Sequence, residues 1–187
     1  MRASQPALLA AGRVIADMRD PMVTQWADWL GDRMTAAPTI PRPLVEREFK
    51  LLLDVISEMV GPLRREVNTI WLHVCEHYGR VGSARGLAAG EVVEELQFLR
   101  ELLIRNLAPV LAAMRARQGM AIMLQLNRVI DKGIAVAVVG YTDALVATLF
   151  AQNGVPAMAT EYDAGEVKRQ LDSLEKELHS VIKKKKR

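Results

Sequence analysis

The chain has 187 residues, half of them hydrophobic, which is enough to bury a core without disulfides or a structural metal. Its net charge of +3 is smaller than the charge of the basic run at 183–187, so the rest of the chain is slightly acidic and offers no extended basic face for nucleic acid. A lone cysteine, Cys75, and the absence of a signal-like N-terminal segment predict a cytoplasmic protein.

Helices are predicted from the first residues onward. Leu, Ala, Val and Met dominate and aromatics are scarce, a composition that favours helix-on-helix packing. A short helix follows Ser4, and a second begins at Asp20 and Pro21, with Trp26 on its core-facing side. Prolines between 38 and 43 indicate a loop before the next helix, which runs to about residue 60.

The middle of the chain predicts three more helices. The first spans about 63–78 and ends at Gly79. The second follows Gly90 and bends or restarts near Pro109. Beyond a break at Gly119, a long helix spans about 120–152.

The most apolar window of the chain is 134–150, within this long helix. Gly140, Tyr141, Thr142 and Asp143 interrupt it, and the uninterrupted part is far shorter than the ~20 residues that a membrane-spanning helix needs. We therefore predict a buried helix and no membrane span.

The chain is predicted to divide into a helical domain at 1–152, a linker at 153–162 and an amphipathic helix with a basic tail at 163–187. Apolar residues in the last segment are spaced 4, 3, 4 and 3 apart, as in two heptads of a coiled coil. Such a short helix either packs on the domain or continues a dimer made elsewhere. Its predicted contact residues are Val167, Leu171, Leu174, Leu178 and Val181.

Catalytic chemistry lacks support in the sequence. A Ser-His-acid triad, a nucleophilic Cys-His pair and a phosphate-binding glycine loop have no matching motif. Cys75 lies among apolar residues and is predicted to be an inert buried thiol. A set of glutamates is predicted to form a solvated face, with helical support from a Glu101–Arg105 pair. These glutamates are Glu91, Glu94, Glu95 and Glu101. We therefore predict that the chain is not an enzyme.

His73 and His77 lie four residues apart on one predicted helix, a spacing that can present two imidazoles to a metal or a haem iron. The acid between them, Glu76, stands beside the wrong histidine for a zinc protease. A surface or interhelical structural role is the favoured interpretation, with no metal and no cofactor predicted. A haem or tetrapyrrole site at these histidines is the alternative.

A further set of polar residues interrupts or borders the apolar stripes. Ion pairing between helices is the ordinary explanation for such residues, and contact with a ligand is the alternative. The set comprises Arg85, Arg100, Arg105, Arg128 and Asp131.

Several of these motifs together resemble the N-terminal domain of the RsbR-type co-antagonists of bacterial stressosomes. The similarity covers about 21–151. It rests on a helix with His77 and Tyr78 that leads to an Arg85-Gly86 turn. A Glu-rich helix that ends in Leu99-Arg100 follows, and a later helix carries Asp131 and Tyr141. Trp26 also fits.

The resemblance implies an all-α, globin-like fold without haem and a dimeric sensory domain of bacterial stress signalling. Members of the family act ahead of a STAS domain, a PAS domain or a histidine kinase. We therefore expect a homodimer that relays a change in helix packing to such a partner, with Tyr141 among the candidate switch contacts. A scaffold or adaptor subunit that docks on a larger assembly is the alternative.

Overall fold

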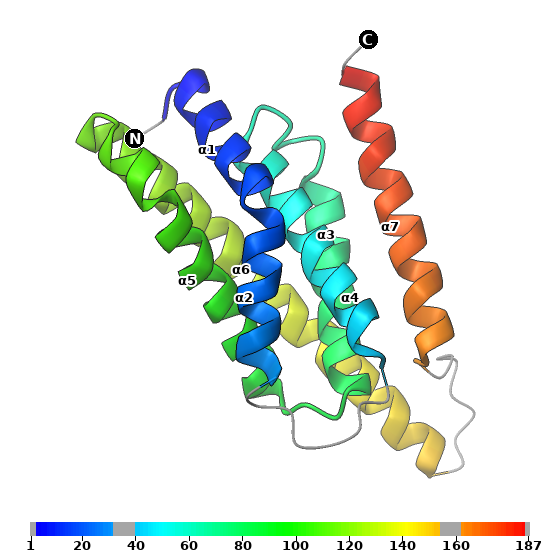
Figure 1. Ribbon diagram of the computed structural model, residues 1–187. Helices are drawn as coiled ribbons and strands as arrows, with labels where there is room; N and C mark the ends of the chain where they lie inside the picture. Colours follow the sequence, from blue (N-terminus) through cyan, green and yellow to red (C-terminus); the bar gives the residue numbers. More distant parts are fainter. Residues whose placement is uncertain (1–2, 32–39, 154–161, 186–187) are drawn as a thin grey trace.

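The computed structural model describes residues 3–31, 40–153 and 162–185. Over these residues the chain forms seven α-helices and no strand, which confirms the all-α prediction (Figure 1). The predicted linker lies almost wholly outside the described residues, as does the end of the basic tail. The helices are α1 Gln5–Asp17, α2 Arg19–Gly31, α3 Arg42–Val60, α4 Asn68–Ala84, α5 Ala89–Ala112, α6 Ala116–Gln152 and α7 Ala164–Lys185.

Helix α4 lies at the centre of the bundle and packs most extensively on α6. Its Trp71 is fully buried and donates a hydrogen bond from Nε1 to the carbonyl oxygen of Val129 at 3.1 Å. Trp26 of α2 is also fully buried, as predicted, and stacks on Phe49 of α3 with ring centroids 4.3 Å apart. Large side chains from four helices thus converge on one core.

Glycines allow α4 and α6 to approach closely. A Cβ at Gly79 would lie 1.8 Å from the carbonyl oxygen of Ala137, and a Cβ at Gly140 would lie 2.1 Å from that of Glu76. Both contacts are far shorter than any real Cβ contact, so α4 and α6 can cross this closely only because glycine has no side chain at these positions. The prediction that Gly79 ends a helix is wrong, because α4 continues past this contact to Ala84.

Other predicted boundaries also change. Pro109 lies inside α5, which continues to Ala112, and Gly119 lies inside α6. The break between these helices falls at 113–115 instead. Gly119 is buried because its backbone packs against the carbonyl of Leu111, where a Cβ would lie 3.1 Å from the oxygen. These glycines therefore mark helix contacts rather than helix ends.

The second half of α6 is largely exposed, so the prediction of a buried helix is wrong. In Figure 1 this part of the helix extends beyond the ends of its neighbours. Among the described helices, α6 meets the length and hydropathy of a membrane span, and its apolar window is 17% buried. The structure thus shows an exposed apolar surface on α6, and the absence of a membrane span stays a prediction. Its most exposed large residues are Val139, Leu145, Val146, Leu149 and Phe150.

Candidate functional site

Helix α7 lies along the flank of the bundle formed by α3 and α4 (Figure 1). The side chain of Asp163 caps its first turn by accepting the Glu166 amide at 2.7 Å. Four residues of its heptad stripe, Val167, Leu171, Leu174 and Leu178, are buried within the same chain, and Val181 is half-buried. The stripe therefore packs on the chain's own helices, and its predicted role in a dimer stays a prediction.

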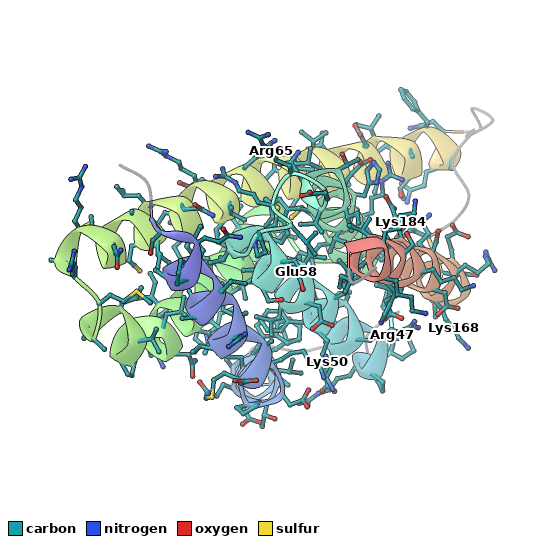
Figure 2. The ribbon with its side chains drawn as sticks, turned by 90° about the horizontal axis from the view of Figure 1, so that it is seen from above. Arg47, Lys50, Glu58, Arg65, Lys168 and Lys184 are labelled. Atoms are coloured by element: carbon teal, nitrogen blue, oxygen red, sulfur yellow. The ribbon has the colours of Figure 1, made fainter. Side chains whose placement is uncertain are left out.

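Arg47 of α3 is the polar anchor of α7. Its guanidinium donates to the Glu175 carboxylate at 2.8 and 2.6 Å and to Asp172 Oδ1 at 2.6 Å. Figure 2 shows Arg47 at the boundary between the two helices, while Lys168 lies farther along α7. These hydrogen bonds raise the pKa of Arg47 and lower the pKa of Asp172, so both groups are held in their charged forms.

Beneath α7 lies a buried acid–imidazole pair, Glu48 of α3 and His77 of α4. The two residues are 0% and 3% exposed, and Nδ1 of His77 contacts Oε1 of Glu48. Among the described residues, neither Glu48 Oε2 nor His77 Nε2 has a hydrogen-bond partner. A buried polar atom left unpaired costs about 1–3 kcal/mol, so a ligand that supplies a partner would bind favourably.

Tyr162 covers this pair from the segment that precedes α7. Its ring lies 5.7 Å from the His77 ring at a tilted angle, and its hydroxyl donates to Gln170 Oε1 at 2.7 Å. Burial and the nearby Glu48 raise the pKa of Tyr162, so the phenol stays protonated. Tyr162 therefore connects His77 to Gln170 of α7.

An open groove of about 300 Å³ lies between α4 and α7. His77 lies in its wall and His73 is exposed on the same helix one turn earlier. The two predicted histidines therefore share one groove but differ in burial. The lining residues are His73, Glu76, His77 and Arg80 from α4, and Gln170, Ser173, Leu174 and Glu177 from α7.

A second buried ionic cluster lies near the end of α4. Arg85 donates to the Glu95 carboxylate at 2.6 and 2.9 Å, and the Tyr78 hydroxyl donates to the same carboxylate at 2.5 Å. Burial raises the pKa of Tyr78, as does the Glu95 charge. Because Glu95 is only 3% exposed, the prediction that it belongs to a solvated face is wrong.

The other predicted contact residues are not gathered at one place. Arg100 pairs with Asp131 at 2.5 Å, and Arg105 pairs with Glu101 as predicted. The Tyr141 hydroxyl donates to a backbone carbonyl of the α4–α5 connection at 2.9 Å. Arg128 is exposed on α6. The contacts of Arg100, Asp131 and Arg105 are those of interhelical and surface ion pairs.

Glu48 was not among the predicted site residues, although its position carries a signal. Val45, Glu48, Phe49 and Leu52 are spaced i, i+3, i+4 and i+7, so the acid lies on the apolar stripe of α3. A residue in that register faces the core together with the apolar residues of the stripe. A buried acid there needs a hydrogen-bond or charge partner. The pattern predicts burial of Glu48 but does not identify His77 as the partner.

Comparison of the chain with models of protein families, with curated proteins and with solved structures finds no match. The fold is therefore described as all-α with seven helices over the described residues. The globin-like arrangement and the family resemblance stay predictions.

Proposed function

We propose that the chain is a non-enzymatic bacterial signal-transduction domain that relays a ligand- or partner-induced change through α7. The observation that supports this most is the position of α7 beside a buried, incompletely hydrogen-bonded acid–imidazole pair, whose His77 lies in the wall of the groove between α4 and α7. Part of the energy that holds α7 in place comes from one arginine, Arg47. A ligand with different affinities for the docked and released arrangements would shift their populations.

The proposed output is a change in what α7 contacts. When docked, its apolar stripe is covered by α3 and α4. When released, the same stripe is available to a partner helix or to a second copy, as heptad spacing allows. We infer that a STAS-, PAS- or kinase-type module in the cytoplasm receives the signal. The candidate switch contacts on α7 are Val167, Leu171, Leu174, Leu178 and Val181.

A scaffold or adaptor subunit remains a second candidate, since the exposed apolar side of α6 suits docking on a larger assembly. The haem alternative has less support. A tetrapyrrole needs apolar walls on both faces, whereas the groove beside His73 and His77 has a volume of about 300 Å³ and is lined mainly by polar side chains.

Spin labels on α7 and on the bundle test the two arrangements. We would label Arg65→Cys and Ser180→Cys, both at exposed positions, and measure the distance distribution by double electron–electron resonance. Cys75 is buried and burial raises its pKa, so the native thiol stays unlabelled. We expect a docked and a released population, with the released one increased by Arg47→Ala.

Arg105→Ala is the control, because it removes an exposed pair within α5. It should leave the distance distribution unchanged. A single distance that Arg47→Ala does not alter would contradict a signalling role for α7.

A further inference from the structure

Helix α7 has the internal contacts of a unit that can dock as a whole. Asp163 caps its first turn, and the Glu166 carboxylate accepts hydrogen bonds from Arg169 and Gln170 in the same helix. These contacts lie within α7 and the residue before it. The apolar stripe, by contrast, is buried against α3 and α4. The helix therefore keeps its own first turn whichever surface its stripe packs on.

The flank formed by α3 and α4 recognises α7 by charge as well as by apolar contact. Arg47 donates to two carboxylates three residues apart on α7, those of Asp172 and Glu175. Leu171 and Leu174 lie beside these acids in the sequence and are 0% and 9% exposed. The pattern that this flank binds is therefore an acid pair framed by apolar residues at heptad spacing.

The end of α6 is left uncovered when α7 docks on its own chain. Leu149 and Phe150 are 48% and 53% exposed, and α6 ends two residues later at Gln152, before α7 begins at Ala164. Figure 1 shows this end of α6 beyond the ends of its neighbours. If two copies exchange α7, each connection starts at one copy's α6 and ends on the other copy, which brings the two α6 ends together. Such a pair covers apolar surface that a single chain exposes to water.

We propose that α7 docks on the α3–α4 flank of a second copy of the chain, so that two copies exchange this helix. Every contact that α7 makes with its own flank is available on the other flank, because the two flanks are identical. The groove between α4 and α7 is then built by two chains, with His73 and Arg80 from one copy and Gln170 and Glu177 from the other. The inference rests on the proposed function, because it names the surface to which the released helix goes.

Spin labels on separate chains test the exchange. Arg65→Cys is labelled in one sample and Ser180→Cys in another, each in the folded state, and the two are mixed in denaturant and refolded together at high micromolar concentration. Any distance between the two labelled positions in this mixture joins two chains. Double electron–electron resonance should show the docked distance, which is the one that a doubly labelled chain gives. Refolding the doubly labelled chain with an excess of unlabelled chain should remove it.

Charge reversal identifies the flank. Arg47→Glu in the chain labelled at 65 should abolish the docked distance between chains, because a third carboxylate then faces the two of α7. Asp172→Lys combined with Glu175→Lys in the chain labelled at 180 should restore it. The matched control is Lys50→Glu, which reverses an exposed charge of α3 that pairs with Asp20 of α2. It should leave the distance unchanged.

The outcomes separate the exchange from the signalling role of α7. A mixture without the docked distance, together with a doubly labelled chain that keeps it on dilution, would overturn the exchange and leave the proposed function intact. A distance between chains that Arg47→Glu does not alter would overturn the assignment to the α3–α4 flank. A docked distance between chains with no released population would support the exchange and contradict the proposed function.

Discussion

Glu95 accepts three hydrogen bonds in the core, two from Arg85 and one from Tyr78. A buried ion pair gains little overall stability from its own attraction, because both charges lose their hydration. Removing one partner has a much larger effect, since the other charge stays buried without compensation. The cluster therefore joins the end of α4 to α5, and replacing any one of its three residues leaves another polar group buried without its partner.

Replacing Glu95 with Ala should lower the free energy of unfolding by about 3–5 kcal/mol, because Arg85 would remain charged and buried. Urea denaturation followed by circular dichroism measures the change. Glu101→Ala is the matched control, as it removes an exposed ion pair with Arg105 and should cost less than about 1 kcal/mol. Equal effects of the two substitutions would show that Glu95 is not a buried charge.

The burial of Glu48 and Glu95 is easier to predict from the sequence than the identity of the residues that pair with them. Glu95 follows Val92 and precedes Leu96 and Leu99 in the same spacing that places Glu48 on the stripe of α3. Burial of both acids could thus be predicted from helical periodicity. Their partners could not, because His77 and Arg85 meet them through tertiary packing that periodicity does not describe. The groove between α4 and α7 could not be predicted either, because it forms only where α7 packs against α4.

At the scale of the helices, the crossing of α4 and α6 depends on backbone contact at Gly79 and Gly140. A helix was correctly predicted before Gly79, but the prediction that this glycine ends it is wrong, because α4 continues to Ala84. Glycine ends helices and also allows helices to cross closely, and sequence alone does not distinguish these uses. The heptad stripe of α7 is a similar case, because the same spacing suits packing on the chain's own bundle or on another chain.

Gly140→Ala should lower the free energy of unfolding by about 1–3 kcal/mol or more, since the added methyl would meet the Glu76 carbonyl and force the helices apart. Thermal unfolding by circular dichroism gives the comparison. Gly90→Ala is the control, because no atom lies within 4 Å of a Cβ placed there. It should leave stability unchanged or raise it by about 0.5–1 kcal/mol. A neutral effect at Gly140 would contradict the close crossing.

Acid should release α7 from the bundle. Arg47 lowers the pKa of Asp172 below its ordinary value of 3.8. A lowered pKa in the docked state means that this contribution to docking is complete above pH 3.8 and is lost as the pH falls through the lowered value. Hydrogen exchange of α7, compared with that of α4 from pH 6 downward, measures the release.

Asp172→Asn separates this effect from general acid unfolding. The variant should exchange faster in α7 at neutral pH and should show a weaker dependence of that exchange on acid. An acid response in α7 identical to that of the wild-type chain would assign the release to other groups.

At the scale of the whole molecule, the exposed second half of α6 is the least explained surface of an otherwise well-packed chain. Between 133 and 152 its one charged residue is Asp143. Exposed apolar patches of this kind usually mark an interface. A second copy of the chain is the occupant that fits the proposed signalling role, because a symmetric pair of α6 helices would place two α7 helices in one assembly.

Val139→Glu combined with Val146→Glu should convert a dimer into a monomer, because both side chains are exposed on α6 and a buried carboxylate at either site would be unpaired. Size-exclusion chromatography with light scattering at high micromolar concentration gives the mass. The matched control is Arg128→Glu, an exposed charge change on the part of α6 that packs in the bundle, which should keep the dimer. Thermal unfolding of the double variant should retain a cooperative transition, since neither valine belongs to the core of the single chain. A monomeric wild-type chain would contradict the homodimer, and an unchanged dimer in the double variant would move the interface away from α6.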